Sequence, residues 1–135
     1  MAKTFSHPSL QVQKDKPLVY TAMSKHLFYY RTFISAFVLK QGGVPLNPFM
    51  VFDYFLSDTV DRDLVREGNN NLVKRSDQIW VFGPVSDGAL AEIILANKEG
   101  KPIRYFTTDY KTGIAETTKE KAELEPNIAD KRHLL

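Results

Sequence analysis

The sequence predicts one α/β domain, with a doubly wound, Rossmann-like or flavodoxin-like parallel sheet of four to five strands flanked by helices. Three observations predict this fold. Short apolar runs alternate with segments of helical period over residues 17–110, which is the pattern of repeated strand–helix–strand units. The run at 78–82 is apolar in every residue after Gln78, as expected of a central strand covered on both faces. The length of 135 residues fits one domain with an ordinary core.

The N-terminal part is expected to begin with a flexible arm, because residues 1–16 are polar. Residues 18–23 have the length and composition of a first strand. Ser24 is placed to cap a helix over 25–41, whose apolar residues recur at three- and four-residue spacing. Residues 44–46 are predicted to form a short second strand at an edge of the sheet, since its central proline cannot donate a ladder hydrogen bond.

The second helix is expected to start after Ser57 or Asp58 and to run to about Arg75. Four poor helix formers, residues 68–71, interrupt this segment. Two explanations are open. The stretch places short amide side chains such as that of Asn69 against a ligand, or it forms a loop between two short helices, which is the slightly preferred alternative.

The C-terminal part is predicted to contain a third helix over 88–98 and a fourth strand over 102–106. Beyond that strand the chain turns polar. Residues 111–135 are therefore expected to form a polar helix and tail, with a charged surface helix over 116–125 and a loose end.

Composition excludes several classes of function. The 18 Lys and Arg balance 16 Asp and Glu, and the basic residues are scattered, so binding of a nucleic acid polymer is not expected. There is no cysteine, the three histidines lie far apart, and no apolar run is long enough to span a membrane. We expect a cytoplasmic protein without a metal, a cofactor or a membrane partner, and the polar N-terminus shows no secretory signal.

The most informative segment is the third predicted helix. From residue 88 to residue 96 every side chain is apolar or small except that of Glu92. A helix that is apolar all round is normally buried, and a buried carboxyl group must be paired, hydrogen-bonded or protonated. Two explanations stay open: Glu92 faces a crevice as a nucleophile or acid–base group, or it forms a salt bridge at the helix edge.

In sheets of this type the ligand crevice lies beyond the carboxyl ends of the strands, where the strand order reverses. Ser86, Asp87 and Gly88 follow the central strand, at a helix N-terminus whose free N–H groups suit an anion or a sugar hydroxyl. Ser and Asp at this place are more often plain N-caps. Tyr20 lies in the first strand and can turn its hydroxyl toward the crevice, although core tyrosines are common.

An aromatic cluster follows the second strand and is more often part of a core or a subunit contact than a wall against which a base stacks. Its members are Phe49, Phe52, Tyr54 and Phe55.

Taken in order, these segments resemble the nucleoside 2-deoxyribosyltransferase-like superfamily, which includes the deoxynucleoside 5′-monophosphate N-glycosidases. The likeness covers about residues 18–106 and is most specific at Ser86-x-Gly88-x-x-x-Glu92. Further matching segments are Val19-Tyr20, Gly42-Gly43-Val44, Asn47-Pro48, Arg75-Ser76-Asp77, Ala96 and Gly100-Lys101-Pro102.

The resemblance implies that Glu92 is the catalytic glutamate, which attacks the anomeric carbon and forms a glycosyl–enzyme intermediate. It implies that Tyr20 lies near that carboxyl group and that Ser86 contacts the sugar or its 5′-phosphate. By position along the chain, the substrate is further expected against Asp87, Gly88, Met23, Ala22 and Pro48. The helix N-terminus is expected to keep Glu92 ionised at neutral pH.

Two departures from the family pattern concern activity. Asn69 stands where active members tend to carry an aspartate that helps to handle the base, and an amide cannot transfer a proton as a carboxyl group does. Asp61, Asp63 and Asp87 are the alternative carboxylates. The segment after Tyr20, residues 21–24, lies where many members have a glycine that leaves room for the ligand, so Met23 is expected to narrow the pocket.

Three hypotheses follow. The first is an N-glycosidase or deoxyribosyltransferase that acts on a nucleoside or nucleotide through Glu92. The second is a nucleoside- or nucleotide-binding module that has lost the chemistry. The third is an interaction protein whose aromatic segment 49–56 is a subunit interface. The resemblance also implies a homodimer or larger assembly.

Overall fold

The structure is a computed structural model and describes residues 4–52 and 56–135. The predicted alternation of strands and helices is confirmed. The strands are β1 (Leu18–Met23), β2 (Val44–Leu46), β3 (Gln78–Gly83), β4 (Ile103–Asp109) and β5 (Gly113–Thr117). The α-helices are α1 (Arg31–Lys40), α2 (Pro48–Val51), α3 (Arg62–Arg75) and α4 (Asp87–Lys98). Short 3₁₀ helices are η1 (Pro8–Gln11), η2 (Lys25–Tyr30), η3 (Leu56–Asp58), η4 (Pro126–Ile128) and η5 (Arg132–Leu134).

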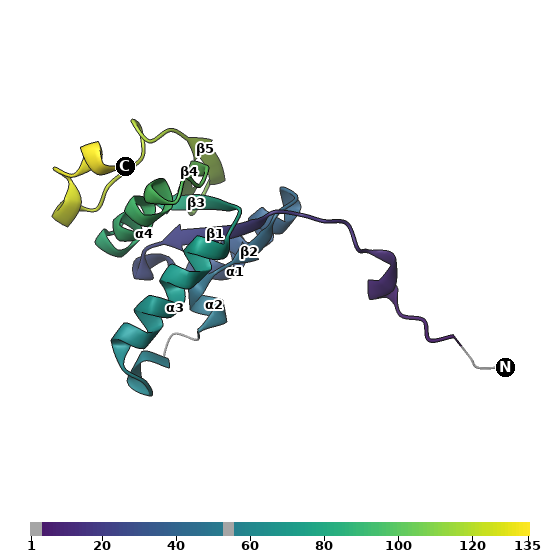
Figure 1. The fold of residues 1–135 in the computed structure, drawn as a ribbon. Coiled ribbons are helices and arrows are strands. Elements are labelled where there is room, and N and C mark those ends of the chain that lie inside the picture. The colour runs from purple at the N-terminus through teal and green to yellow at the C-terminus, as the bar shows by residue number, and fades with distance from the viewer. Residues whose placement is uncertain (1–3, 53–55) are drawn as a thin grey trace.

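A five-stranded sheet with the order β2-β1-β3-β4-β5 forms the centre of the molecule (Figure 1). The strands β2, β1, β3 and β4 are parallel, and β5 pairs antiparallel with β4. The predicted fold class is therefore confirmed, with the difference that the sheet is mixed. The strand order reverses between β1 and β3, because the chain leaves β1 toward β2 and returns on the other side of β1.

The charged helix predicted over 116–125 does not form, because residues 116 and 117 belong to the antiparallel strand β5 and residues 118–125 contain no helix, so that prediction is wrong. Asp109 accepts hydrogen bonds from the amides of Lys111 and Thr112 at 2.7 and 3.1 Å, and Gly113 has a φ of 88°, so the chain reverses immediately after β4. Arg104 and Glu116 then form a two-point ion pair across the two strands. A turn residue with a positive φ and a cross-strand pair outweighed the helical composition of this segment.

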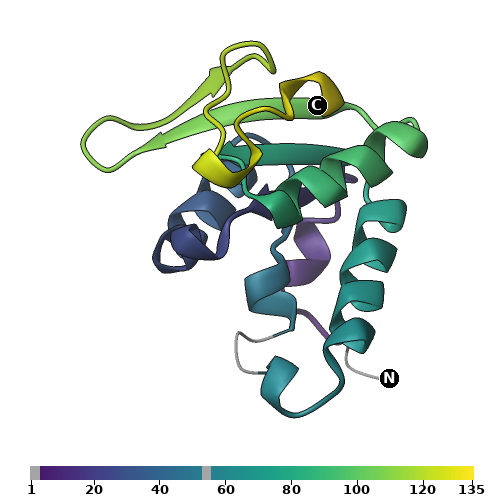
Figure 2. The same ribbon diagram turned by 90° about the vertical axis from the view of Figure 1, so that its left-hand side faces the viewer.

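Helices cover both faces of the sheet (Figure 2). On one face, side chains of α3 and α4 such as Val73 and Ile93 pack against Tyr20 of β1. On the other, Ile34 of α1 packs against Phe82 of β3. Residues alternate between the two faces along each strand, so Tyr20 points toward α4 while its neighbour Val19 points toward α1.

Two predicted helices begin later than expected. The segment predicted as a helix over 25–41 starts as the 3₁₀ helix η2 and becomes α-helical at Arg31. Its first part is rich in aromatic residues, which lose rotamer freedom in an α-helix. Helix α3 is capped by Asp61, which accepts a hydrogen bond from the amide of Asp63, and not by Ser57 or Asp58.

Helix α3 also runs without interruption through residues 68–71, so the preferred break there is wrong. A Cβ at Gly68 would lie 2.7 Å from the ring of Phe52. The aromatic ring occupies the space that the glycine leaves, and this tertiary contact holds a sequence of weak intrinsic propensity in the helical form. Of the aromatic cluster, Tyr54 and Phe55 lie outside the described residues.

The N-terminal arm is exposed, whereas the C-terminal segment packs against the body of the protein. Residues 4–16 are all exposed and extend away from the body as an arm (Figure 1). The C-terminal segment is not loose, because Ala122 and Ile128 are buried in the core beside α4. Arg132 donates hydrogen bonds to the carbonyls of Lys119 and Ala122, both at 2.7 Å.

Candidate functional site

A cavity of about 390 Å³ opens beyond the carboxyl ends of β1 and β3. This is the point at which the strand order reverses, where the sequence analysis placed the crevice. The residues that line it come from the end of β1, from η2, α2, α3 and α4, from the segment between β3 and α4, and from the C-terminal segment. They are Met23, Ser24, Lys25, His26, Phe49, Arg62, Arg66, Ser86, Asp87, Gly88, Ala89, Glu92 and Glu125.

The structure brings Glu92 and Tyr20 together. Glu92 lies in the second turn of α4 and lines the cavity. Tyr20 is fully buried in β1, and its hydroxyl donates a 2.8 Å hydrogen bond to Oε1 of Glu92. Because β1 presents Tyr20 on the face that α4 covers, the phenol orients the carboxyl group from behind and leaves Oε2 unengaged.

Oε2 of Glu92 is buried and has no hydrogen-bond partner among the described residues. Burial raises the pKa of Glu92 to about 8, although the hydrogen bond from Tyr20 opposes this rise. Burial, with the adjacent Glu92, likewise raises the pKa of the Tyr20 hydroxyl well above its usual value. The salt-bridge alternative for Glu92 is therefore not what the structure contains.

The raised pKa corrects one expectation. The helix N-terminus was expected to keep Glu92 ionised at neutral pH, but Glu92 lies one turn beyond the free N–H groups of α4. The field of a helix end falls off within the first turn, so desolvation dominates. With a pKa of about 8, roughly one-tenth of the carboxyl groups are ionised at pH 7 in the empty site.

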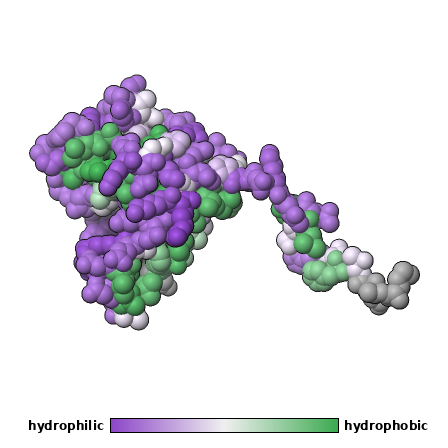
Figure 3. All heavy atoms as spheres, in the orientation of Figure 1, coloured by the Kyte–Doolittle hydropathy of each residue, from purple (hydrophilic) through white to green (hydrophobic). Residues whose placement is uncertain are grey.

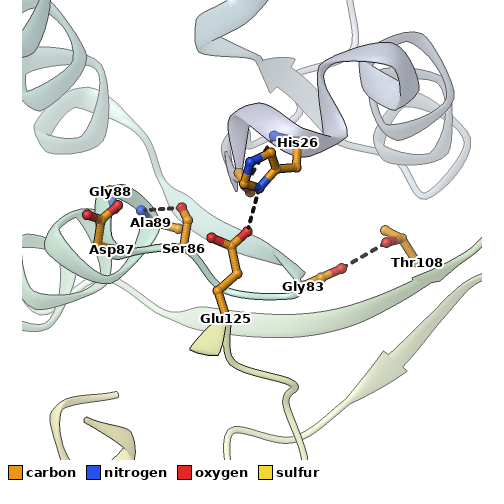
Figure 4. A network of polar contacts seen from close by, with 9 residues as sticks. His26, Gly83, Ser86, Asp87, Gly88, Ala89, Thr108 and Glu125 are labelled. Carbon is orange, nitrogen blue, oxygen red and sulfur yellow. Dashed lines mark hydrogen bonds and ion pairs between the residues drawn. The ribbon is translucent and has the colours of Figure 1, made fainter. Parts of the chain in front are cut away.

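Ser86, Asp87 and Gly88 form the rim of the cavity at the start of α4 (Figure 4). The Ser86 hydroxyl accepts a 3.1 Å hydrogen bond from the amide of Ala89, so Ser86 is an N-cap. Asp87 accepts a 2.7 Å hydrogen bond from the amide of Gly88. The residues at the start of α4 therefore also form part of the cavity wall. Because the Ser86 hydroxyl oxygen acts as the acceptor in the cap, its hydrogen stays available for a ligand.

The remaining predicted residues lie at different depths. Met23 lines the cavity, and its sulfur accepts a hydrogen bond from the side-chain amide of Asn47. Ala22 is fully buried in β1, Pro48 is buried at the start of α2, and neither lines the cavity. Asn69 does not line it either, but Oδ1 of Asn69 is buried and, within the described residues, has no hydrogen-bond partner.

Of the alternative carboxylates, one belongs to the cavity. Asp87 lines it, whereas Asp61 caps α3 and Asp63 forms an exposed ion pair with Arg66. Within the described ranges no three His, Cys, Asp or Glu side chains are grouped as they would be around a metal ion. No described helix has the length and apolar character needed to cross a membrane.

Five polar residues of the cavity wall were not predicted from the sequence, namely Lys25, His26, Arg62, Arg66 and Glu125. Lys25 and His26 follow β1 directly, so their position after a strand end was a usable signal. Glu125 gave no such signal, because it reaches the cavity from a C-terminal segment whose path depends on tertiary contacts.

A comparison with known protein families shows the family to which the chain belongs. Residues 20–106 match the model of a family described as "Domain of unknown function (DUF7768)", and the chain belongs to this family. No curated protein matches the sequence.

Two solved structures are similar in fold. A 2-deoxyribosyltransferase from Leishmania mexicana shares 18% sequence identity, with a TM-score of 0.54 over 85% of this chain and 87% of that chain. The CMP N-glycosidase BcmB of Clostridium botulinum shares 22% identity, with a TM-score of 0.49 over 70% of this chain and 71% of the other. The deoxyribosyltransferase likeness supports the expected fold. At these identities it shows the fold alone.

Proposed function

We propose that the protein cleaves the N-glycosidic bond of a nucleoside or nucleotide, with Glu92 as the nucleophile. The observation that carries this proposal is the carboxyl group of Glu92, which lines a cavity at the strand-order reversal. One of its oxygens is held by Tyr20, and the other has no hydrogen-bond partner in the part of the chain that the structure describes. A buried polar atom without a partner is costly. A ligand that supplies positive charge or a hydrogen bond to Oε2 removes that cost.

The chemistry of the bond matches this carboxyl group. Cleavage of an N-glycosidic bond builds positive charge on the sugar ring, which a nearby carboxylate stabilises or traps. Oε2 of ionised Glu92 forms a bond to the anomeric carbon as the electron pair of the C–N bond leaves with the base. Tyr20 keeps Oε1 in place through its hydrogen bond. Water, or a second base in a transfer reaction, then displaces the carboxylate.

The raised pKa of Glu92 fits a carboxyl group whose ionisation depends on the ligand in the cavity. In the empty cavity desolvation favours the neutral acid. A sugar that develops positive charge next to Oε2 favours the ionised form instead. The carboxylate therefore interacts more strongly with the transition state than with the ground state, which is the requirement for catalysis.

One observation favours a second candidate, the binding module that has lost the chemistry. Asn69 replaces the expected aspartate, and its Oδ1 is buried without a described partner. An amide cannot transfer a proton to a leaving base as a carboxyl group does, and Asn69 does not line the cavity.

The test is a panel of purine and pyrimidine deoxynucleosides, ribonucleosides and their 5′-monophosphates, with free base measured by chromatography. We expect release from at least one substrate, and a loss of about a thousandfold or more in Glu92→Gln. Glu99→Gln, at the exposed C-cap of α4, is the matched control and should leave release unchanged.

The same panel separates the two candidates. A substrate that raises the melting temperature without release of base, in the wild-type protein and in Glu92→Gln alike, supports the binding module. Release that persists in Glu92→Gln contradicts the proposed mechanism.

A further inference from the structure

A histidine and a carboxylate from distant parts of the chain meet at the mouth of the cavity. Nδ1 of His26 lies 3.2 Å from Oε2 of Glu125 and 3.3 Å from the hydroxyl of Ser24. Figure 4 shows the imidazole ring lying over the Glu125 carboxylate, next to the turn that carries Ser86. All hydrogen bonds of the ring in the described part of the chain involve Nδ1, which leaves Nε2 available to a ligand.

Both partners of this pair are held by backbone hydrogen bonds. The amide of His26 donates to the hydroxyl of Ser24 at the end of β1, at 3.1 Å. The amide of Glu125 donates to the carbonyl of Val85 at 2.9 Å, and the amide of Val85 donates to the carbonyl of Glu123 at 2.8 Å. The C-terminal segment thus pairs with the extension of β3 and fixes Glu125 under the imidazole ring.

The pair and Glu92 lie at different depths of one cavity. Oε2 of Glu92 is buried, whereas the side chain of Glu125 is 16% exposed and that of His26 is 70% exposed. A second, outer hollow of about 500 Å³ adjoins the mouth. It shares four residues with the inner cavity, namely Lys25, His26, Asp87 and Glu125. The imidazole ring therefore borders both the inner and the outer space.

We propose that His26 is the group that protonates the leaving base, that Glu125 orients it, and that the substrate lies with its sugar inward and its base outward. This inference rests on the proposed function. It answers the question raised by Asn69, which carries no carboxyl group and does not line the cavity, because the proton donor must then come from another element. An imidazole held at Nδ1 by a carboxylate presents its second nitrogen to a substrate, and this is a common acid–base arrangement.

The proposed step balances in protons and electrons. The imidazolium of His26 gives the proton on Nε2 to a ring nitrogen or exocyclic oxygen of the base, while the C–N electron pair leaves with the base. Glu92 forms the bond to the anomeric carbon. In hydrolysis, neutral His26 then takes a proton from the attacking water, the new C–O bond forms, and the bond to Glu92 breaks with its electron pair returning to the carboxylate.

The charges around the ring are mixed. Glu125 and Asp87 are the acidic groups that face the mouth, and Lys25 is the basic group beside them. Arg62 and Arg66 reach the inner cavity from α3, on the side of Glu92. A purely structural role is the competing explanation, in which the ion pair only attaches the C-terminal segment to η2.

The experiment compares two leaving groups in the intact protein. The first substrate is the ordinary deoxynucleoside or deoxynucleotide that the wild-type protein cleaves best. The second is nicotinamide 2′-deoxyriboside, whose pyridinium base leaves as a neutral molecule and needs no proton. The variants are His26→Gln and Glu125→Gln. The control is His133→Gln, an exposed histidine of η5 that lies outside the cavity.

We expect kcat/KM of His26→Gln to fall by about a hundredfold or more with the ordinary substrate and by less than about threefold with the pyridinium substrate. Glu125→Gln should show the same selectivity with a smaller loss, because it acts through His26. His133→Gln should match the wild-type protein. A structural role predicts equal losses with both leaving groups, so equal losses overturn the proposal, as does no loss with either.

Two further outcomes are decisive. A wild-type protein that releases nicotinamide but no ordinary base lacks a proton donor, and this overturns the inference; loss of the nicotinamide release in Glu92→Gln then shows that Glu92 still acts as the nucleophile. A wild-type protein that cleaves neither substrate overturns both. If the cavity rejects the pyridinium base, added imidazole should restore base release in His26→Gly and not in Glu92→Gln; failure to restore it overturns the proposal.

Discussion

At the scale of single residues, the Tyr20–Glu92 contact joins a fully buried phenol to a carboxyl group whose pKa is raised by burial. A carboxyl group whose pKa is higher in the folded than in the unfolded protein binds its proton more tightly when folded. The stability that goes with this proton is present at low pH and is lost as the pH rises. For Glu92 the loss runs from about its usual pKa of 4.5 to about 8.

This pH dependence gives a stability prediction. Glu92→Gln keeps the size of the side chain and an oxygen for Tyr20 but has no proton to lose. We expect the variant and the wild-type protein to be similar in stability near pH 5. At pH 7 the variant should be more stable by about 3 kcal/mol, and the difference should grow further toward pH 8. Urea denaturation at each pH measures it.

The exposed Glu99→Gln variant is the control for that experiment, because its side chain is solvated in both states. Wild-type and Glu92→Gln stability curves that run parallel from pH 5 to pH 8 would contradict the raised pKa of Glu92.

Sequence alone located Glu92 because one carboxyl group in an apolar helical stretch has few explanations. It located the start of α4 for a similar reason, since Ser86 has the side chain of an N-cap. The His26–Glu125 pair could not be predicted from the sequence. Its partners are 99 residues apart in sequence, and neither lies in a segment with an unusual pattern. Such pairs follow from tertiary structure and not from local composition.

At the scale of elements, α3 shows how contacts outweigh propensity. Gly68 and three asparagines each favour non-helical backbone. The aromatic ring against Gly68, the Asp61 cap and the basic side chains of Lys74 and Arg75 at the last turn act in the other direction. Asn69 consequently stays on the helix, one turn before the buried Val73, where its amide faces inward.

The C-terminal segment is a second element whose packing matters for the site. Ile128 of η4 is 5% exposed and belongs to the core cluster beneath α4. We expect Ile128→Ala to lower the free energy of unfolding by about 2–4 kcal/mol, because the substitution leaves a cavity among buried side chains. Chemical denaturation measures the loss.

Leu134→Ala, at a 39% exposed position of the following 3₁₀ helix, is the matched control, and its effect should stay within about 0.5 kcal/mol. Equal, small effects of both substitutions would mean that the C-terminal segment is not part of the core. The segment would then not hold Glu125 at the cavity mouth.

At the scale of the whole molecule, strand order decides where the cavity lies. Alternating strands and helices were sufficient to predict parallel pairing for β1 to β4 and a crevice beyond their carboxyl ends. They were not sufficient for β5, because a tight turn after Asp109 reverses the chain and adds an antiparallel edge strand. The turn spans only residues 110–112. Such a short segment gives a weaker sequence signal than the ten residues of helical composition at 116–125.

The expected homodimer stays a prediction. Figure 3 shows a mostly hydrophilic face, with an apolar area at the end of the body where α3 begins. Val60 and Leu64 are exposed there, by 38% and 59%. Further exposed apolar side chains, Phe33 and Met50, lie on α1 and α2. Scattered apolar residues of this kind are compatible with an interface and with an ordinary protein surface.

The most direct test of the central claim is to trap the bond between Glu92 and the sugar. A 2′-fluoro nucleoside slows breakdown of such an intermediate, because fluorine disfavours positive charge on the sugar. We predict an increase in protein mass by one fluorinated sugar, carried by the peptide that contains Glu92 and missing in Glu92→Gln. Release of base with the label on another residue, or equally fast release by Glu92→Gln without any adduct, would contradict the account.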